Sequence, residues 1–308
     1  MIEYKCTSPI LIIIFNRPQF VKKLINILRR VQPSRVYVVA DGPREGEIGD
    51  IANCSNARNE IDKIDWKCHI EKKYSETNLG CGLNPSQGIS WALDRSEEVI
   101  ILEDDCMPSI DFFKYCDELL KKYRDEERIM MISGNNHTFG KFDFKSSYEF
   151  SHHTQTYGWA TWRRSWCKYD LSMKKWPALD SLMWLKEKTG SNKSAKFWYR
   201  IFEMCYKKEL ESAWDYQWTF CCWINSGLNI IPSVNLVSNV GFNDAGTHEI
   251  DPGHIISKVP LGKIDFPLTH PQQLKSDKKL DRVIQGVVYT PPLIRRVSDK
   301  LKYLINNL

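Results

Sequence analysis

Three consecutive carboxylates, Glu103-Asp104-Asp105, directly follow an apolar run at residues 99–102. Such a run is typical of a strand that is buried on both faces of a parallel sheet. Adjacent negative charges repel one another unless a cation is present. Carboxylate oxygens suit Mg²⁺ or Mn²⁺, which bind one or two carboxylates together with the phosphates of a substrate. The triplet therefore indicates a metal-diphosphate site, and the open alternative is a solvated acidic turn ahead of a helix.

Two other polar clusters follow apolar runs that are predicted to be buried strands. Asn16-Arg17-Pro18 follows residues 9–15, and Asp41-Gly42-Pro43 follows residues 36–40. Ligands of open α/β sheets bind at the carboxyl ends of the strands. We therefore expect Arg17, Asp41 and the acidic triplet to meet at one edge of a sheet.

The elements that must position these residues alternate along the first half of the chain. The predicted strands are at residues 9–15, 36–40, 99–102 and 128–133, with a weaker one near residues 69–70. Helical spacing of apolar residues predicts helices at 18–31, 52–64, 85–93 and after Pro108. A strand and a helix recur about every 30 residues, which is typical of βαβ units in an open α/β sheet.

The overall composition excludes several classes of protein. Charged residues make up 26% and hydrophobic residues 42% of the 308 residues, which excludes wholesale disorder. The net charge of +5 is too small for a tail that coats nucleic acid, so we expect no nucleic-acid partner. The 10 Cys include no C-x-x-C pair and no zinc spacing, which indicates reduced thiols in a cytosolic protein.

Beyond Asn135 the sequence becomes irregular and rich in tryptophan. The chain has 11 Trp, and all of them except Trp66 and Trp91 follow the acidic triplet. Tryptophan rings pack in a core or bind a ligand with their flat faces. We expect residues 1–134 and 135–250 to be two halves of one domain. Residues 251–308 should wrap the surface and end in a helix.

Asp215 stands between Trp214 and Trp218 in a segment with a helical pattern. Apolar surroundings raise the pKa of a carboxyl group and suit a general base. An aspartate on a helix surface between two core tryptophans would have the same sequence. The residue types alone leave both interpretations open.

Eight segments, taken together, resemble a known family of enzymes. Residues 99–113 resemble the metal-binding segment of GT-A-fold glycosyltransferases, in the branch that includes the N-acetylglucosaminyltransferase I type. The whole chain resembles a bacterial group of nucleotide-diphospho-sugar transferases over about residues 10 to 270. The segments are Ile14-Phe15-Asn16-Arg17-Pro18, Ala40-Asp41-Gly42-Pro43, Asn78-Leu79-Gly80-Cys81-Gly82, Ile101-Leu102-Glu103-Asp104-Asp105-Cys106, Ser133-Gly134-Asn135-Asn136, Gly158-Trp159-Ala160-Thr161-Trp162-Arg163, Trp214-Asp215-Tyr216-Gln217-Trp218, and Ser238-Asn239-Val240-Gly241-Phe242 running to Thr247-His248.

The resemblance implies a GT-A (Rossmann-like) open mixed sheet flanked by helices, with an irregular, Trp-rich acceptor half. Residues 1–134 would bind the nucleotide sugar, and residues 135–250 would bind the acceptor and carry the catalytic base. The implied nucleotide-sugar ligands are Arg17, Asp41, Asn78, Leu79, Gly80, Glu103 and Asp104. For Asp41, the residues alone leave open a plain turn-capping role before Gly42.

The resemblance also implies roles in metal binding and catalysis. Asp105 would be the direct metal ligand, and His248 either contacts the metal or diphosphate or is simply exposed to solvent. Asp215 would be the base that activates the acceptor, although the enzymes compared have two adjacent acids where this chain has Asp215-Tyr216. The implied acceptor and sugar ligands are Gly158, Trp159, Trp214 and Trp218.

The activity implied is a metal-dependent, inverting glycosyl transfer that uses Mn²⁺ or Mg²⁺. The expected donor is a nucleotide diphosphate sugar, most simply a UDP-sugar, and the expected acceptor is a glycan or lipid-linked glycan. A sugar-1-phosphate nucleotidyltransferase is one alternative, but it would need a glycine-rich loop where this chain has Asn16-Arg17-Pro18. A non-catalytic carbohydrate-binding protein is the other alternative.

The sequence predicts a cytoplasmic protein, because no signal peptide or membrane-spanning segment is evident. Residues 293–304 place Ile294, Val297, Leu301 and Leu304 on one helical face, with Arg295, Arg296, Lys300 and Lys302 off it. A basic amphipathic helix of this kind binds anionic lipid, so we expect peripheral contact with the inner face of the membrane. The open alternative is a helix docked on the body of the protein.

Overall fold

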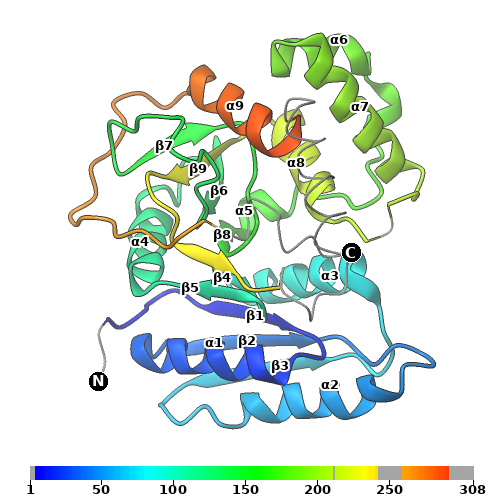
Figure 1. Ribbon diagram of the computed structural model, residues 1–308, viewed down its shortest axis with the longest axis vertical. Coiled ribbons are helices and arrows are strands. Elements are labelled where there is room, and N and C mark those ends of the chain that lie inside the picture. The colour runs from blue at the N-terminus through cyan, green and yellow to red at the C-terminus, as the bar shows by residue number, and fades with distance from the viewer. Residues whose placement is uncertain (1–3, 211, 242–258, 291–308) are drawn as a thin grey trace, which may run out of the picture.

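The computed structural model describes residues 4–210, 212–241 and 259–290 of the 308-residue chain. Eight strands form one mixed sheet in the order β3-β2-β1-β4-β8-β6-β9-β7 (Figure 1). Their bounds are β1 Ile10–Ile14, β2 Arg35–Ala40, β3 His69–Tyr74, β4 Glu98–Glu103, β6 Ile129–Ser133, β7 Tyr148–Ser151, β8 Trp159–Trp162 and β9 Leu228–Pro232. A small antiparallel sheet pairs β5 Cys106–Pro108 with β10 Val237–Asn239.

Helices cover both faces of the large sheet, which confirms the predicted fold class of an open mixed α/β sheet flanked by helices (Figure 1). One face carries α1 Pro18–Val31, α2 Ile48–Ile61 and α4 Ile110–Lys122. The other carries α3 Gly80–Leu93, α5 Arg163–Trp166, α6 Ser181–Thr189, α7 Asn192–Tyr206 and α8 Asp215–Ile224. A smaller cluster holds α9 Lys278–Ile284 and the π-helical segment Gln285–Tyr289 against β9.

Burial on both faces explains why β1 is a continuous apolar run. All five of its residues are buried. Ile10, Ile12 and Ile14 belong to the core on one face, whereas Leu11 and Ile13 belong to the core on the other. This alternation is the period of two of a β-strand, with apolar surroundings on both sides.

The strand register brings the predicted polar clusters to the same edge of the sheet. In the parallel pair β1–β2, Ile14 lies opposite Ala40. In the parallel pair β1–β4, Ile13 lies opposite Glu103. The residues that follow these three strands therefore leave the sheet at the same level.

Two predicted helix boundaries are wrong. The helix expected at 85–93 begins at Gly80, because the Asp41 carboxylate accepts hydrogen bonds from the backbone N–H groups of Leu79 and Gly80 and thereby fixes the first turn. The helix expected at 52–64 spans Ile48–Ile61. The helix that starts at Pro18 and the strand that ends at Ser133 are confirmed.

The sheet continues across residue 134, since β8 pairs with both β4 and β6. The two predicted halves therefore share one sheet. His248 and the predicted basic helix at 293–304 lie outside the described residues. Within the described ranges, no helix is both long and apolar enough to cross a membrane.

Candidate active site

The loop after β1 contacts the acidic triplet at the end of β4 through hydrogen bonds and ion pairs. The backbone N–H of Phe15 donates to Asp104 Oδ2 at 3.1 Å. Arg17 Nη1 lies 3.3 Å from Asp104 Oδ1 and 3.0 Å from Asp105 Oδ2, and its side chain is 11% exposed. Arg17, predicted to face the nucleotide, is thus held against the two aspartates.

Asp105 is fixed from the other side by β10 and the residues after it. Asn239 Nδ2 donates to Asp105 Oδ1 at 3.3 Å, and the backbone N–H of Val240 donates to the Asp105 carbonyl at 2.9 Å. A Cβ atom on Gly241 would lie 2.2 Å from Asp105 Oδ2, so only glycine lets the backbone pass this close. Asn239 and Gly241 are positioning residues that the sequence analysis missed as site residues, although it included them in a family segment.

Asp215 reaches the same site from a distant part of the chain. It is the first residue of α8, and burial raises the pKa of its carboxyl group against the opposing effect of two backbone N–H groups. Its charge also contributes to the raised pKa of Glu103, so Asp215 acts electrostatically on the acidic triplet from the start of α8. The structure therefore brings together the predicted base and the predicted metal-binding triplet.

The electrostatics of the site are those of crowded, buried acids. Burial first, and then the charges of the neighbouring acids including Asp215, raise the pKa of Glu103 to about 8. Burial and the charge of Asp105 raise the pKa of Asp104 to about 7, although Arg17 opposes this shift. Four carboxyl groups thus share the site with the guanidinium of Arg17.

A third missed residue is Tyr157, which precedes β8. Burial raises the pKa of its hydroxyl, and the charges of Asp215, Asp105 and Glu103 raise it further. This hydroxyl therefore stays protonated beside the acids and is able to donate a hydrogen bond there. No spacing signal in the sequence points to Tyr157, because only the fold brings β8 next to β4.

The acidic edge fits a hard divalent cation of the kind that substrate phosphates help to hold. A cation would neutralise the charges whose repulsion raises the pKa of Glu103 and Asp104. Among the described residues, no group of three or more His, Cys, Asp or Glu side chains is placed so that it could hold a metal ion. Mg²⁺ and Mn²⁺ do not need such a group, since one or two carboxylates, water and phosphate oxygens complete their coordination.

Asp41 anchors the loop before α3. Its Oδ1 accepts from the N–H groups of Gly42 and Leu79, both at 2.8 Å, and its Oδ2 accepts from Gly80 N–H at 2.9 Å. Asn78 Nδ2 adds a contact to Oδ2 at 3.2 Å. Gly80 has a φ of +81°, which favours glycine. The carboxylate is 5% exposed, and all of its acceptor positions are used within the protein, so here it organises the predicted nucleotide loop.

The prediction that Trp159, Trp214 and Trp218 form a stacking surface for a sugar is wrong in this structure. Trp159, Trp214 and Trp218 are 1%, 6% and 0% exposed. Trp159 lies 5.7 Å from Trp214 and 5.8 Å from Trp218 between ring centroids, so the three rings pack on one another. Such a cluster buries large apolar area and leaves no free face for a sugar ring. Gly158 lies at the start of β8, where its carbonyl accepts from Gly134 N–H at 2.9 Å.

Comparisons with known proteins add little to this geometry. No family model matches the chain, and no curated protein matches it. Among solved structures, a UDP-glucose pyrophosphorylase complexed with UDP-glucose matches 41% of this chain and 56% of its own, with 14% identity and a TM-score of 0.26. The match therefore spans little more than half of that protein, and a TM-score this low does not relate the two folds.

Proposed function

We propose that this protein is a metal-dependent glycosyltransferase of GT-A type that uses a nucleotide diphosphate sugar as donor. The proposal is supported by the carboxyl end of β4, where Arg17 contacts Asp104 and Asp105 and the charge of Asp215 acts on Glu103. A glycosyl transfer needs both a base for the acceptor and a counter-charge for the departing diphosphate. This site holds a half-buried acid, Asp215, for the first task and a carboxylate edge that suits a cation for the second.

The residues divide the work as follows. Asp215 accepts the proton of the attacking acceptor hydroxyl, because its raised pKa makes it a stronger base than an exposed aspartate. Asp105, with Glu103 or Asp104, would hold Mn²⁺ or Mg²⁺, which supplies positive charge to the leaving diphosphate. Arg17 orients Asp104 and Asp105 and offsets part of their negative charge, and Tyr157 stays protonated in the field of the acids.

A single base on the acceptor side corresponds to inversion at the anomeric carbon, which is the outcome we propose. The donor is a UDP-sugar, and the acceptor is a hydroxyl group of a glycan or lipid-linked glycan. The loop at 78–80, which Asp41 holds in place through the N–H groups of Leu79 and Gly80, would lie along the nucleotide. The proposal places the protein in the cytoplasm at the inner face of the membrane, with His248 as a further metal contact.

Thermal shift with donors and metal tests this function. Purified protein is heated with UDP-, GDP- and dTDP-sugars, each with and without Mn²⁺, and a donor that binds the folded state raises the melting temperature. We expect a shift with a UDP-sugar that requires Mn²⁺ and is lost in Asp105→Asn. Glu45→Gln, an exposed acid in the β2–α2 loop, is the matched control and keeps the shift.

Product analysis separates the proposal from its rivals. A glycosyltransferase releases free nucleoside diphosphate from the donor. A sugar-1-phosphate nucleotidyltransferase instead exchanges pyrophosphate, and a carbohydrate-binding protein releases nothing. We expect Asp215→Asn to keep the metal-dependent thermal shift and to lose about 100-fold or more in the rate of transfer. If no donor changes the melting temperature, the proposed function is wrong.

A further inference from the structure

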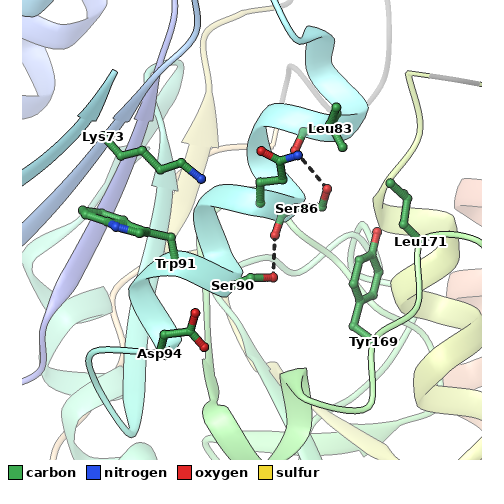
Figure 2. A pocket seen from close by; sticks show the side chains of 9 residues that line it. Lys73, Leu83, Ser86, Ser90, Trp91, Asp94, Tyr169 and Leu171 are labelled. Carbon is green, nitrogen blue, oxygen red and sulfur yellow. Dashed lines mark hydrogen bonds between the residues drawn. The ribbon is translucent and has the colours of Figure 1, made fainter. Parts of the chain in front are cut away.

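A cavity of about 390 Å³ lies along α3, outside the carboxylate site. Figure 2 shows that Ser86 and Ser90 of α3 lie between two walls. Lys73 and Trp91 stand on one side, and Tyr169 and Leu171 stand on the other. This volume falls within the range of pockets that bind small molecules.

The floor of the cavity is a regular stripe of one helix. Leu83, Ser86, Gln87, Ser90, Trp91 and Asp94 all line it. Their spacing of three and four residues places them on one face of α3. From Leu83 to Asp94 the helix rises about 16 Å, so the cavity is an elongated groove. Its floor is hydroxylic and amidic, unlike the apolar face that α3 turns to the core through Ile89, Ala92 and Leu93.

The two aromatic walls are held in fixed positions. The Trp91 ring meets Tyr37 edge-on at 5.5 Å and carries the Arg95 guanidinium at 4.8 Å from its centroid. The Tyr169 ring stacks on Trp166 at 4.2 Å with an interplanar angle of 13°. Rings fixed in this way lose little conformational entropy when a ligand docks against them.

The charges at the rim are available for a ligand. Lys73 Nζ and the Asp94 carboxylate form no ion pair within the described part of the chain. Ser90 Oγ accepts from Trp166 Nε1 at 2.9 Å and donates to Ser86 O at 2.9 Å, so the floor is hydrogen-bonded into the fold. A neutral, hydroxyl-rich ligand satisfies both an ammonium and a carboxylate, whereas an ion of either sign is repelled by one of them.

Chain connectivity and one hydrogen bond link the groove to the candidate active site. Leu83 is three residues beyond Gly80, whose backbone N–H is bound by Asp41. Tyr169 donates its hydroxyl to the carbonyl of Trp214 at 3.1 Å, and Trp214 directly precedes Asp215. A chain molecule that lies along α3 would therefore reach toward the acidic edge.

We propose that the groove along α3 binds a neutral oligosaccharide, namely the part of the glycan acceptor that lies away from the reacting hydroxyl. Sugar rings present C–H faces that pack on Trp91 and Tyr169, and hydroxyl groups that bond to Lys73, Asp94 and the serines. This inference rests on the proposed function for the role of the bound glycan. In this proposal the groove along α3, and not the buried tryptophans, binds the acceptor.

The test is direct binding of glycans in the absence of any donor. The full chain is screened on an array of neutral, amino-sugar and uronic-acid oligosaccharides, and the best binder is titrated by saturation-transfer NMR. We expect binding of a neutral or N-acetylated oligosaccharide. Gln87→Trp places a large ring in the groove from an exposed position and should weaken this binding at least tenfold.

Matched variants separate blocking from unfolding. Lys22→Trp makes the same change at an exposed position of α1, on the opposite face of the sheet, and should leave binding unchanged. Lys73→Met keeps the apolar stem and should weaken binding severalfold through loss of the ammonium group. Both Trp variants should melt within about 2 °C of the unmodified chain, because surface substitutions have small effects.

Each outcome bears on this proposal separately from the proposed function. If no glycan binds, or if Gln87→Trp binds as well as the unmodified chain, the groove is not a glycan site. Selective binding of acidic oligosaccharides would also overturn the neutral assignment. The Mn²⁺-dependent shift with a UDP-sugar tests the donor site alone, and Gln87→Trp should retain it in full.

Discussion

Replacing Asp41 tests whether it anchors the loop before α3 or binds the nucleotide directly. Asp41→Ala removes the acceptor of three backbone N–H groups at 2.8, 2.8 and 2.9 Å. A buried donor left unsatisfied costs about 1–3 kcal/mol. The loop borders solvent, so water replaces part of the loss, and we take about 1 kcal/mol for each group. The expected loss in the free energy of unfolding is about 3 kcal/mol, or roughly 5 °C in melting temperature for a chain of 308 residues.

Asp41→Asn provides a graded comparison. An amide oxygen in place of Oδ1 still accepts from Gly42 and Leu79, whereas an amide NH₂ in place of Oδ2 faces the donors of Gly80 and Asn78. We expect about half of the destabilisation found for alanine. Thermal and urea unfolding of the chain without donor measure both values, with Glu45→Gln as the exposed control.

The two roles predict opposite patterns. If Asp41 anchors the loop, both variants lower the melting temperature before any donor is added, and Asn is the milder change. If Asp41 serves only as a nucleotide ligand, the melting temperature without donor stays constant and only the donor-induced shift falls. A change of less than 1 °C in Asp41→Ala would refute the anchoring argument.

Three further predictions concern other parts of the structure. Gly241→Ala should lower donor turnover with little change in melting temperature, because the Cβ of the alanine would displace Asp105 Oδ2. Gly49→Ala, where the new Cβ has ample room, is the matched control in the same turnover assay. Removal of Mn²⁺ with a chelator should abolish the UDP-sugar thermal shift of the unmodified chain and change nothing in Asp105→Asn. Burial, helped by the charge of His152 and opposed by that of Asp281, lowers the pKa of His153 to about 4. Between pH 6.5 and 4 the unfolded chain therefore binds one proton more than the folded chain, and the free energy of unfolding falls by about 3 kcal/mol as the pH drops. His153→Phe should flatten this pH dependence, as measured by urea unfolding.

The sequence by itself determined the sheet and the first part of the site. A strand buried on both faces must be apolar throughout, so β1 and β4 were recognisable from residue type alone. Parallel strands leave a sheet at the same edge, and this rule alone predicts that Arg17 lies near Asp104, as the contact between them shows. Local chemistry also marked Pro18 as a helix start.

Only the tertiary structure decided which distant residues meet these acids and which rings are buried. The charges of Asp215 and Glu103 act on Tyr157 because β8 pairs with β4 and α8 belongs to the core on the same side of the sheet, and no local pattern encodes such long-range contacts. The sequence around Trp159 or Trp218 does not distinguish a ring in the core from a ring on a stacking surface. The exposed area of the ring distinguishes them, and packing alone determines that area. The groove along α3 likewise depends on Tyr169, which comes from another segment of the chain and packs on Trp166.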